Sequence, residues 1–182
     1  MAEQVLAGTA ALITGGGSGI GLATARHLLR DGATVTLAGR SQPRLDAAVE
    51  ELRAEAPEGA EVHAVACDVA QEADVISAVE AASAPTGGLQ HCVASAGTGA
   101  LAPVVAMPVE EWDRVMDINL KGAFFTLKHS GAAMARSGGG AFVALSSIAG
   151  PLTHPFMSAT PRRKTPAVPQ ITADTGSCSR AS

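Results

Sequence analysis

The segment TGGGSGIG, residues 14–21, constrains the fold of this chain more than any other stretch of it. The apolar run TAALIT (9–14) before it is typical of a buried strand. The stretch IGLATARHLLRDG (20–32) after it has apolar residues at helical spacing and a glycine at its end. Glycines let backbone N–H groups approach a ligand closely, and the helix N-terminus adds partial positive charge. The segment therefore predicts a strand–turn–helix unit with an anion site at the turn.

The spacing of the glycines separates this turn from other phosphate-binding loops. It does not fit GxGxxG, because a register starting at Gly15 would need glycine where Ile20 stands. No Lys-Ser/Thr pair follows, so it is not a Walker A loop either. It fits TGxxxGxG through Thr14, Gly15, Gly19 and Gly21. A tight turn without a ligand is the alternative.

Strand and helix patterns alternate along the rest of the chain. We expect strands at 33–39, 61–69, 89–97 and 139–150, the last with its turn, and helices at 42–54, 71–84 and 108–138. Ser41 can cap the first of these helices, and 108–138 is either one long helix or two joined ones. This alternation predicts an α/β fold with a Rossmann-like, doubly wound parallel sheet.

Composition narrows the class of protein. Hydrophobic residues make up 47% of the chain and charged residues 16%, as in globular proteins. The net charge of −4 gives no general footing for nucleic acid. Neither a membrane-spanning stretch nor an N-terminal signal is visible, and no metal-ligand spacing occurs. Because Cys67, Cys92 and Cys178 form no CxxC pair, we expect reduced thiols and a cytoplasmic protein.

The pattern changes at residue 160. We expect a partial dinucleotide-binding Rossmann domain over 1–159 and an aberrant, disordered tail over 160–182, without sustained period. Prolines at 161, 166 and 169 break both helix and central strand in the tail. Its cations are opposed by one acid, Asp174, and have no aromatic residues beside them, so they make a weak nucleic-acid footprint.

Five ordered motifs indicate a family. TGGGSGIG is followed by CDV after the third strand, SAG after the fourth, DINLKG in the long helix and ALSSIAG after the fifth strand. In these motifs the chain resembles the short-chain dehydrogenases/reductases (SDR) over residues 8–159. The resemblance implies an oxidoreductase that moves a hydride between a nicotinamide cofactor and a ketone or secondary alcohol. It also implies a homo-oligomer whose sheet is incomplete here at its C-terminal edge.

The resemblance places the cofactor against the motifs that follow the strands. Asp68 would bond the adenine, although an isolated aspartate at such a place is more often a loop or capping residue. Where the family usually has Asn-Asn-Ala-Gly, this chain has Ala94-Ser95-Ala96-Gly97. The implied cofactor-binding residues in these motifs are Thr14, Gly15, Ser18, Gly19, Ile20, Gly21, Asp68, Val69, Ala96 and Gly97.

The end of the second strand bears on the choice of cofactor. NAD-type sites place an acid there to bond the ribose hydroxyls, whereas this chain has Gly39. Arg40 beside it offers a planar cation suited to phosphate, and Ser41 can also donate. The sequence therefore favours NADP(H) over NAD(H). The alternative is that Arg40 is a solvated residue before a helix.

The catalytic residues implied by the resemblance are present only in part. Asn119 matches the family's asparagine and Ser147 its catalytic serine. The family's tyrosine lies thirteen residues after that serine, where this chain, which has no tyrosine, has Thr160. Lys164 stands where the lysine should be, but Pro161 disfavours the helix that would carry both residues. An aliphatic hydroxyl is far less acidic than a phenol, so we expect an inactive chain.

One missing base before codon 160 would explain the tail, since a neighbouring frame can encode tyrosine there and lysine four residues later. The frameshift would lie in the gene or in its reading. We expect the fifth strand to become a sheet edge with exposed apolar surface, which favours aggregation. Three interpretations remain: an NADP(H)-dependent oxidoreductase, a non-catalytic dinucleotide-binding remnant, and an unstable fragment.

Overall fold

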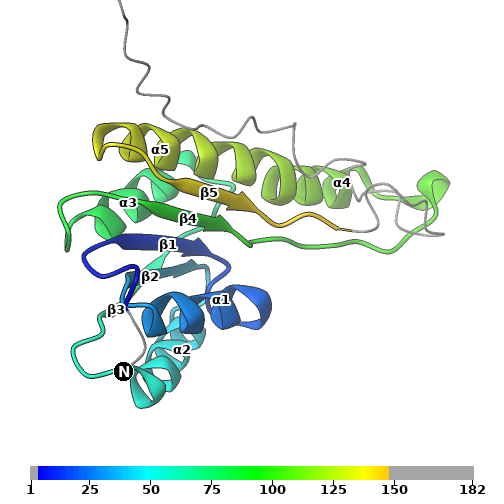
Figure 1. Ribbon diagram of the computed structural model, residues 1–182. Coiled ribbons are helices and arrows are strands. Elements are labelled where there is room, and N and C mark those ends of the chain that lie inside the picture. The colour runs from blue at the N-terminus through cyan, green and yellow to red at the C-terminus, as the bar shows by residue number, and fades with distance from the viewer. Residues whose placement is uncertain (1–3, 148–182) are drawn as a thin grey trace, which may run out of the picture.

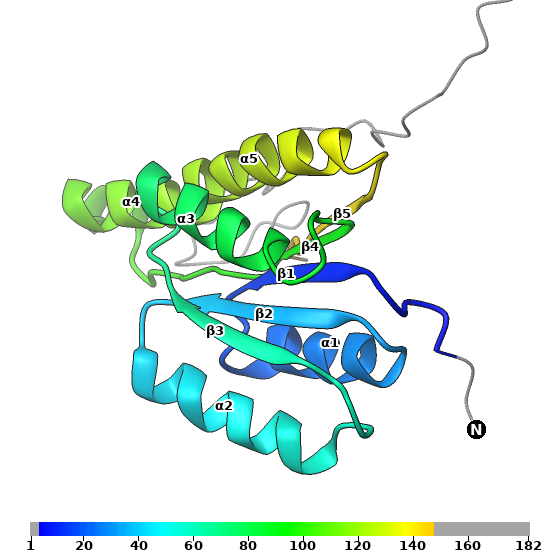
Figure 2. The same ribbon diagram turned by 90° about the vertical axis from the view of Figure 1, so that its left-hand side faces the viewer.

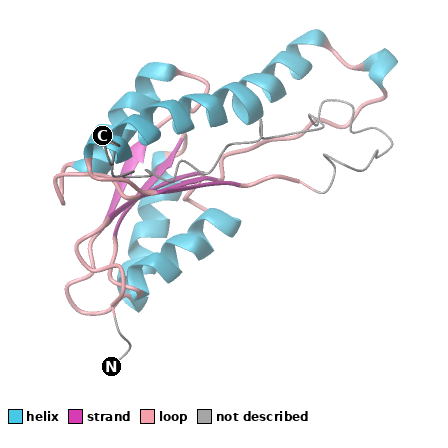
Figure 3. Ribbon diagram, turned by 45° about the horizontal axis from the view of Figure 1, so that its top comes forward, coloured by secondary structure: helices cyan, strands magenta, loops and turns pink. Residues whose placement is uncertain are grey.

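The structure, a computed structural model, describes residues 4–147, which form a parallel sheet between two layers of helices (Figures 1 and 3). The strand order is β3-β2-β1-β4-β5, so the chain winds outward from β1 first to one side and then to the other. This order confirms the predicted Rossmann-like, doubly wound fold. The strands are β1 (Ala10–Thr14), β2 (Thr34–Gly39), β3 (Val62–Ala66), β4 (His91–Ala94) and β5 (Ala141–Ala144).

The central strand explains why the sequence pattern is so apolar. Ala11 and Ile13 of β1 face one layer of helices, and Ala10 and Leu12 face the other. All four are fully buried. A strand that is covered on both faces needs apolar residues at every position, and this explains the continuous run in the sequence.

Two pairs of helices cover the sheet (Figure 2). Helices α1 (Gly19–Arg30) and α2 (Gln42–Glu55) lie on one face, where Leu29 and Leu52 are 1% exposed. Helices α3 (Glu72–Ser83) and α5 (Gly122–Arg136) lie on the other, where Val75 is fully buried. The helices cover both faces of the sheet, and the loops that follow the strands lie at the carboxyl ends of the strands.

The region expected as one long helix or two joined ones is a continuous helical segment with a change of winding. Helix α4 (Val109–Met116) runs into a π-helical turn, η2 (Asp117–Lys121), which runs into α5. The backbone keeps right-handed helical angles across both junctions. Such π turns within α-helices are frequent at functional sites. A short 3₁₀ turn, η1 (Val104–Ala106), precedes α4 and was not expected from the sequence.

The strands are in register at their carboxyl ends. Thr14 pairs with Ala38 of β2 and with Ala94 of β4, which in turn pairs with Ala144 of β5. The observed strands are shorter than expected, since β4 ends at Ala94 rather than at residue 97. The loop residues that follow it therefore leave the sheet and line the site described below.

The remaining expectations from the sequence concern a helix cap, the edge of the sheet and the C-terminal residues. Ser41 occupies the N-cap of α2 as expected, but its hydroxyl makes no capping hydrogen bond. Within residues 4–147, β5 pairs with β4 alone and Val143 is 50% exposed. Thr160, Lys164 and the expected boundary between 159 and 160 lie outside the described residues. No helix in the described part of the chain is long and apolar enough to cross a membrane.

Candidate functional site

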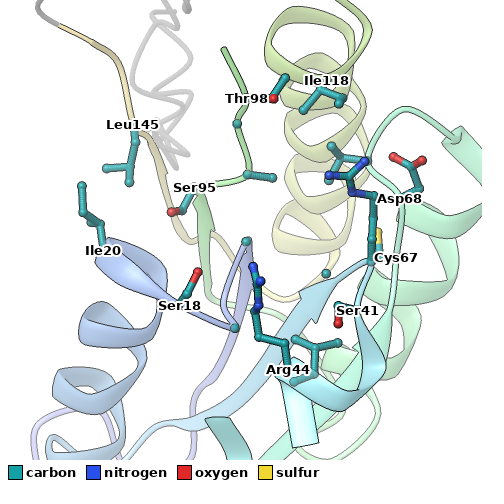
Figure 4. Close-up of a pocket in the computed structure, with 18 of the residues that line it drawn as sticks. Ser18, Ile20, Ser41, Arg44, Cys67, Asp68, Ser95, Thr98, Ile118 and Leu145 are labelled. Carbon is teal, nitrogen blue, oxygen red and sulfur yellow. The ribbon is translucent and has the colours of Figure 1, made fainter. Parts of the chain in front are cut away.

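A cavity of about 960 Å³ opens at the carboxyl ends of the strands (Figure 4). The loops after all five strands contribute to its wall, together with the starts of α1 and α2 and the π turn. Its lining residues are Gly15, Gly17, Ser18, Ile20, Gly39, Arg40, Ser41, Arg44, Leu45, Cys67, Asp68, Val69, Ser95, Ala96, Gly97, Thr98, Gly99, Ile118, Leu145, Ser146 and Ser147.

The glycine turn lies tightly against the loop after β4. Gly15 has a φ of +68°, and a Cβ on it would lie 2.8 Å from the backbone nitrogen of Ala96. A Cβ on Gly21 would lie 2.5 Å from the carbonyl oxygen of Gly15. The buried Thr14 accepts a hydrogen bond from the Ala96 N–H through Oγ1, at 3.4 Å. Thr14, Gly21 and Gly19, the first residue of α1, belong to the turn but are not among the residues that line the cavity.

The N-terminus of α1 is open to an anion from outside the chain. Ser18 occupies the N-cap, but its hydroxyl makes no capping hydrogen bond, and Figure 4 shows it directed toward the cavity. The first turn of α1 holds no acidic residue. By contrast, α3 and α4 have two acids each in their first turns, Glu72 and Asp74 in one and Glu110 and Glu111 in the other. The helix that faces the cavity therefore lacks an anion of its own near its positive end.

Two cations line the cavity beyond the end of β2. Arg40 and Ser41 directly follow the strand, as the sequence indicates. Arg44 reaches the same space from the first turns of α2, and Figure 4 shows its side chain extending into the cavity. A Cβ on Gly17 would lie 3.3 Å from Cγ of Arg44, so the arginine stem lies close to the glycine turn. Arg44 was not among the residues expected from the sequence, because helical periodicity alone does not separate a cavity-facing position from a solvated one.

Asp68, after β3, stabilises the turn in which it lies and also lines the cavity. Oδ1 of Asp68 accepts a hydrogen bond from the Ala70 N–H at 3.1 Å, and the Asp68 N–H donates to Oδ2 of Asp74 at 3.0 Å. The neighbouring Cys67 is 3% exposed, and burial, helped by both carboxylates, raises the pKa of its thiol to about 11. Val69 lines the cavity and packs against Gly122 at the start of α5.

Asn119 lies behind the cavity wall rather than in it. It is 3% exposed within the π turn and is bonded on both sides of its amide to the backbone of Thr98. Its Oδ1 accepts from the Thr98 N–H at 2.8 Å, and its Nδ2 donates to the Thr98 carbonyl at 2.7 Å. In the described chain, Asn119 thus holds the loop after β4.

The loop after β5 brings the expected serine to the same cavity. The Leu145 N–H donates to the Ala94 carbonyl at 3.0 Å, which extends the pairing of β5 with β4 by one residue. Ser146 and Ser147 follow it and line the cavity. The structure therefore brings Ser147 together with the residues expected to bind a dinucleotide. Thr160 and Lys164, expected beside it, lie outside the described residues.

Metal ligands are not gathered in this part of the chain. Among residues 4–147, no three His, Cys, Asp or Glu side chains come close enough together to hold a metal ion. The polar groups that line the cavity are arginine, serine and threonine side chains, backbone N–H groups and one carboxylate, that of Asp68. The donors among them suit a phosphate-bearing organic ligand.

The sheet is parallel and doubly wound, and the cavity lies where the strand order reverses. A glycine turn leads into a helix whose first turn has no acidic residue. These features together define a dinucleotide-binding α/β fold. The family model described as short chain dehydrogenase matches residues 9–160. The chain belongs to the short-chain dehydrogenase family, which binds NAD(P).

Individual relatives agree with the family. The oxidoreductase asL5 of Sarocladium schorii is 38% identical over 157 residues, which cover 86% of this chain and 61% of that protein. The 2-dehydro-3-deoxy-L-rhamnonate dehydrogenase (NAD(+)) of Sphingomonas sp. (strain SKA58) is 36% identical, with 84% and 59% covered. A short-chain type dehydrogenase/reductase structure from Mycobacterium ulcerans has a TM-score of 0.84 and 37% identity, with 87% and 58% covered. The chain thus spans about three fifths of the length of these relatives.

Proposed function

We propose that this chain binds NADP(H) in the cavity and does not transfer a hydride as its sequence stands. The observation that carries the proposal is the distribution of charge along the cavity wall. The first turn of α1 has no acid, and both Arg40 and Arg44 line the space beyond β2. The α1 N-terminus and Ser18 would hold the pyrophosphate, and the cations would hold the 2′-phosphate.

The preference for the phosphorylated cofactor follows from Gly39. A carboxylate at this position would accept hydrogen bonds from the ribose hydroxyls of NAD and would repel a 2′-phosphate. From Gly39 through Leu45 the chain has no acidic residue. Asp46, the first acid after β2, accepts a hydrogen bond from Gln42 at 2.7 Å. The relative named as an NAD(+) dehydrogenase makes NAD(H) the competing cofactor.

The chemistry of the family requires a proton donor in addition to the cofactor. The nicotinamide supplies or accepts the hydride, the substrate being a ketone or a secondary alcohol. Ser147, in the cavity, would orient the substrate oxygen. Thr160 stands where the family has tyrosine, and its aliphatic hydroxyl is a much weaker acid than a phenol of pKa about 10. The chain would therefore be a non-catalytic dinucleotide-binding protein.

Calorimetric titration with NADPH and NADH tests the binding. We expect the wild-type chain to bind NADPH more tightly than NADH. Arg40→Ala should raise the Kd for NADPH by about tenfold or more, the effect of losing a hydrogen bond to a charged group. Gly39→Asp should reverse the preference. The new Cβ has room, because the nearest atom is Cδ2 of Leu45 at 3.5 Å. Gly39→Ala is the matched control, and a preference for NADH in wild type would overturn the assignment.

Turnover is tested separately by NADPH absorbance with a panel of ketones, and by NADP⁺ reduction with secondary alcohols. We expect no turnover from the pure chain. Ser147→Ala serves as the control for contaminating reductases, whose activity it would leave unchanged. Turnover that is present in the wild type and lost in Ser147→Ala would contradict the non-catalytic assignment.

A further inference from the structure

Thr98, in the cavity wall, is held at every one of its polar groups by side chains from the long helical segment. Asn119 bonds its backbone N–H and carbonyl at 2.8 and 2.7 Å. Arg114 of α4 donates from Nη1 to the Thr98 hydroxyl at 2.8 Å. Arg114 also donates from Nη2 to the carbonyl of Gly99 at 3.1 Å. Two helical side chains therefore hold Thr98 and Gly99, in the loop that follows β4, by hydrogen bonds.

The guanidinium that makes these bonds is itself oriented. Glu111, one turn earlier on α4, accepts from Nη2 of Arg114 at 2.8 Å and from Nε at 3.2 Å. The hydrogen bond from Arg114 lowers the pKa of the Glu111 carboxyl, as expected for a carboxylate that accepts from a guanidinium. The arginine thus connects an acid on α4 with two consecutive residues of the loop.

The other end of the loop is tied to the sheet. The Ser95 N–H donates to the carbonyl of Thr14 at 3.2 Å, next to the close contact between Gly15 and Ala96. The segment from Ser95 to Gly99 lines the cavity along its whole length. Arg114 does not line the cavity, so any effect it has on a ligand passes through Thr98 and Gly99.

An exposed i,i+3 ion pair on a helix contributes little by itself. Arg53 and Glu50 on α2 form such a pair, at 3.0 Å, and the further bond of Arg53, from Nη2 to the Val62 carbonyl at 3.4 Å, lies outside the cavity lining. The pair of Arg114 with Glu111 has the same spacing, but Arg114 also donates two hydrogen bonds to residues of the cavity wall. This difference separates a positioning role from ordinary surface charge.

We propose that Arg114 is a positioning residue that sets the place of the Thr98–Gly99 wall of the cavity and thereby the affinity for the dinucleotide. The effect on affinity rests on the proposed function, whereas the effect on the wall does not. Loss of the arginine removes the bonds to the Thr98 hydroxyl and the Gly99 carbonyl, while Asn119 still holds the Thr98 backbone. Because the loop is also tied to the sheet at Ser95, the wall loosens at its Thr98–Gly99 end and the sheet stays intact.

The test compares Arg114→Met, Thr98→Val and their double variant by NADPH titration. Each single change should raise the Kd by about three- to tenfold, the range for losing one or two hydrogen bonds. The Kd of the double variant should be close to that of Arg114→Met, because both changes remove the bond between Arg114 and the Thr98 hydroxyl. Thr98→Ser retains the hydroxyl and should bind nearly as wild type. Arg53→Met is the matched control for loss of an i,i+3 pair and should leave the Kd unchanged.

A second measurement needs no ligand. Hydrogen exchange at the Thr98 amide should be faster in Arg114→Met than in wild type and unchanged in Arg53→Met, while the midpoint of thermal unfolding stays close to that of wild type. An unchanged Kd and exchange rate in Arg114→Met would overturn the proposal, as would additive effects in the double variant. If wild type bound neither dinucleotide, the proposed function would fail, and the exchange rates would still decide whether Arg114 holds the wall.

Discussion

Among single residues, Gly15 combines a left-handed backbone conformation with a close contact to backbone of another loop. Its φ is +68°, and a Cβ would lie 2.8 Å from the backbone nitrogen of Ala96. Gly59 has a comparable φ of +82° with open space around it, so Gly59→Ala isolates the cost of the left-handed conformation, about 1–2 kcal/mol. Gly15→Ala should cost about 1–3 kcal/mol more, because backbone must move. Urea denaturation measures both, and equal losses would contradict the close contact.

The buried thiols should be inert near neutral pH. Burial raises the pKa of Cys67 to about 11 and that of Cys92 to about 12, so both remain protonated, and the thiolate is the reactive form. The stability that the neutral Cys67 contributes is full below the unfolded pKa of about 8.5. It is lost as the pH rises through about 11.

We therefore expect iodoacetamide to alkylate Cys67 far more slowly in the folded chain than in urea at pH 7.5, and the two rates to converge as the pH approaches 11. Peptide mass spectrometry reads the modification at each cysteine. Cys92, which is fully buried, is the internal control and should react more slowly still. Rapid labelling of Cys67 in the folded chain at pH 7.5 would show that the thiol is accessible and ionised.

At the scale of elements, one carboxylate joins α3 to α5. Oε1 of Glu72 accepts from Nζ of Lys128 at 2.7 Å and contacts Nε2 of His129 at the same distance. Hydrogen bonds from Lys128 first, then from His129, lower the pKa of Glu72. The stabilisation is therefore present above the unfolded pKa of about 4.3 and is lost as the pH falls through the lower pKa of the folded state.

Glu72→Gln should lower the midpoint of thermal unfolding by no more than a few degrees at neutral pH, because the pair is partly exposed. The difference from wild type should shrink as the pH drops below about 4. Glu80→Gln is the control on the same helix, since its side chain has no ion pair with any residue of 4–147. A difference that persisted unchanged at low pH would rule out the carboxylate bridge.

For the whole molecule, the exposed face at β5 should govern association between chains. Val143 is 50% exposed on a strand that, within residues 4–147, has a partner on one side only. A lysine on such a strand opposes pairing between sheet edges. Val143→Lys should reduce light scattering at high protein concentration with little change in the unfolding midpoint. Val5→Lys, at a residue 67% exposed and outside the sheet, is the control. Equal effects of the two would indicate a general effect of charge.

The order of strands and helices and the location of the cavity could be predicted from the amino-acid sequence. Runs such as AALI in β1 are apolar throughout because both faces of the sheet are covered, and this pattern can be recognised without a structure. The strand–turn–helix around Gly15 and the residues just after each strand follow from local order along the chain. Most of the predicted binding residues therefore line one cavity, although their roles stay predictions.

Which side chains far apart in the sequence come into contact depended on the fold of the whole chain. Arg114 reaches Thr98 from sixteen positions further along the chain, and Gln90 reaches the N–H of Ala10 across eighty. Arg44 extends toward the glycine turn from a different element. Helical or strand periodicity states which face of an element is buried, but not which residue of another element lies opposite. That pairing depends on how the helices pack on the sheet and on where β4 ends, and neither is written in a local pattern.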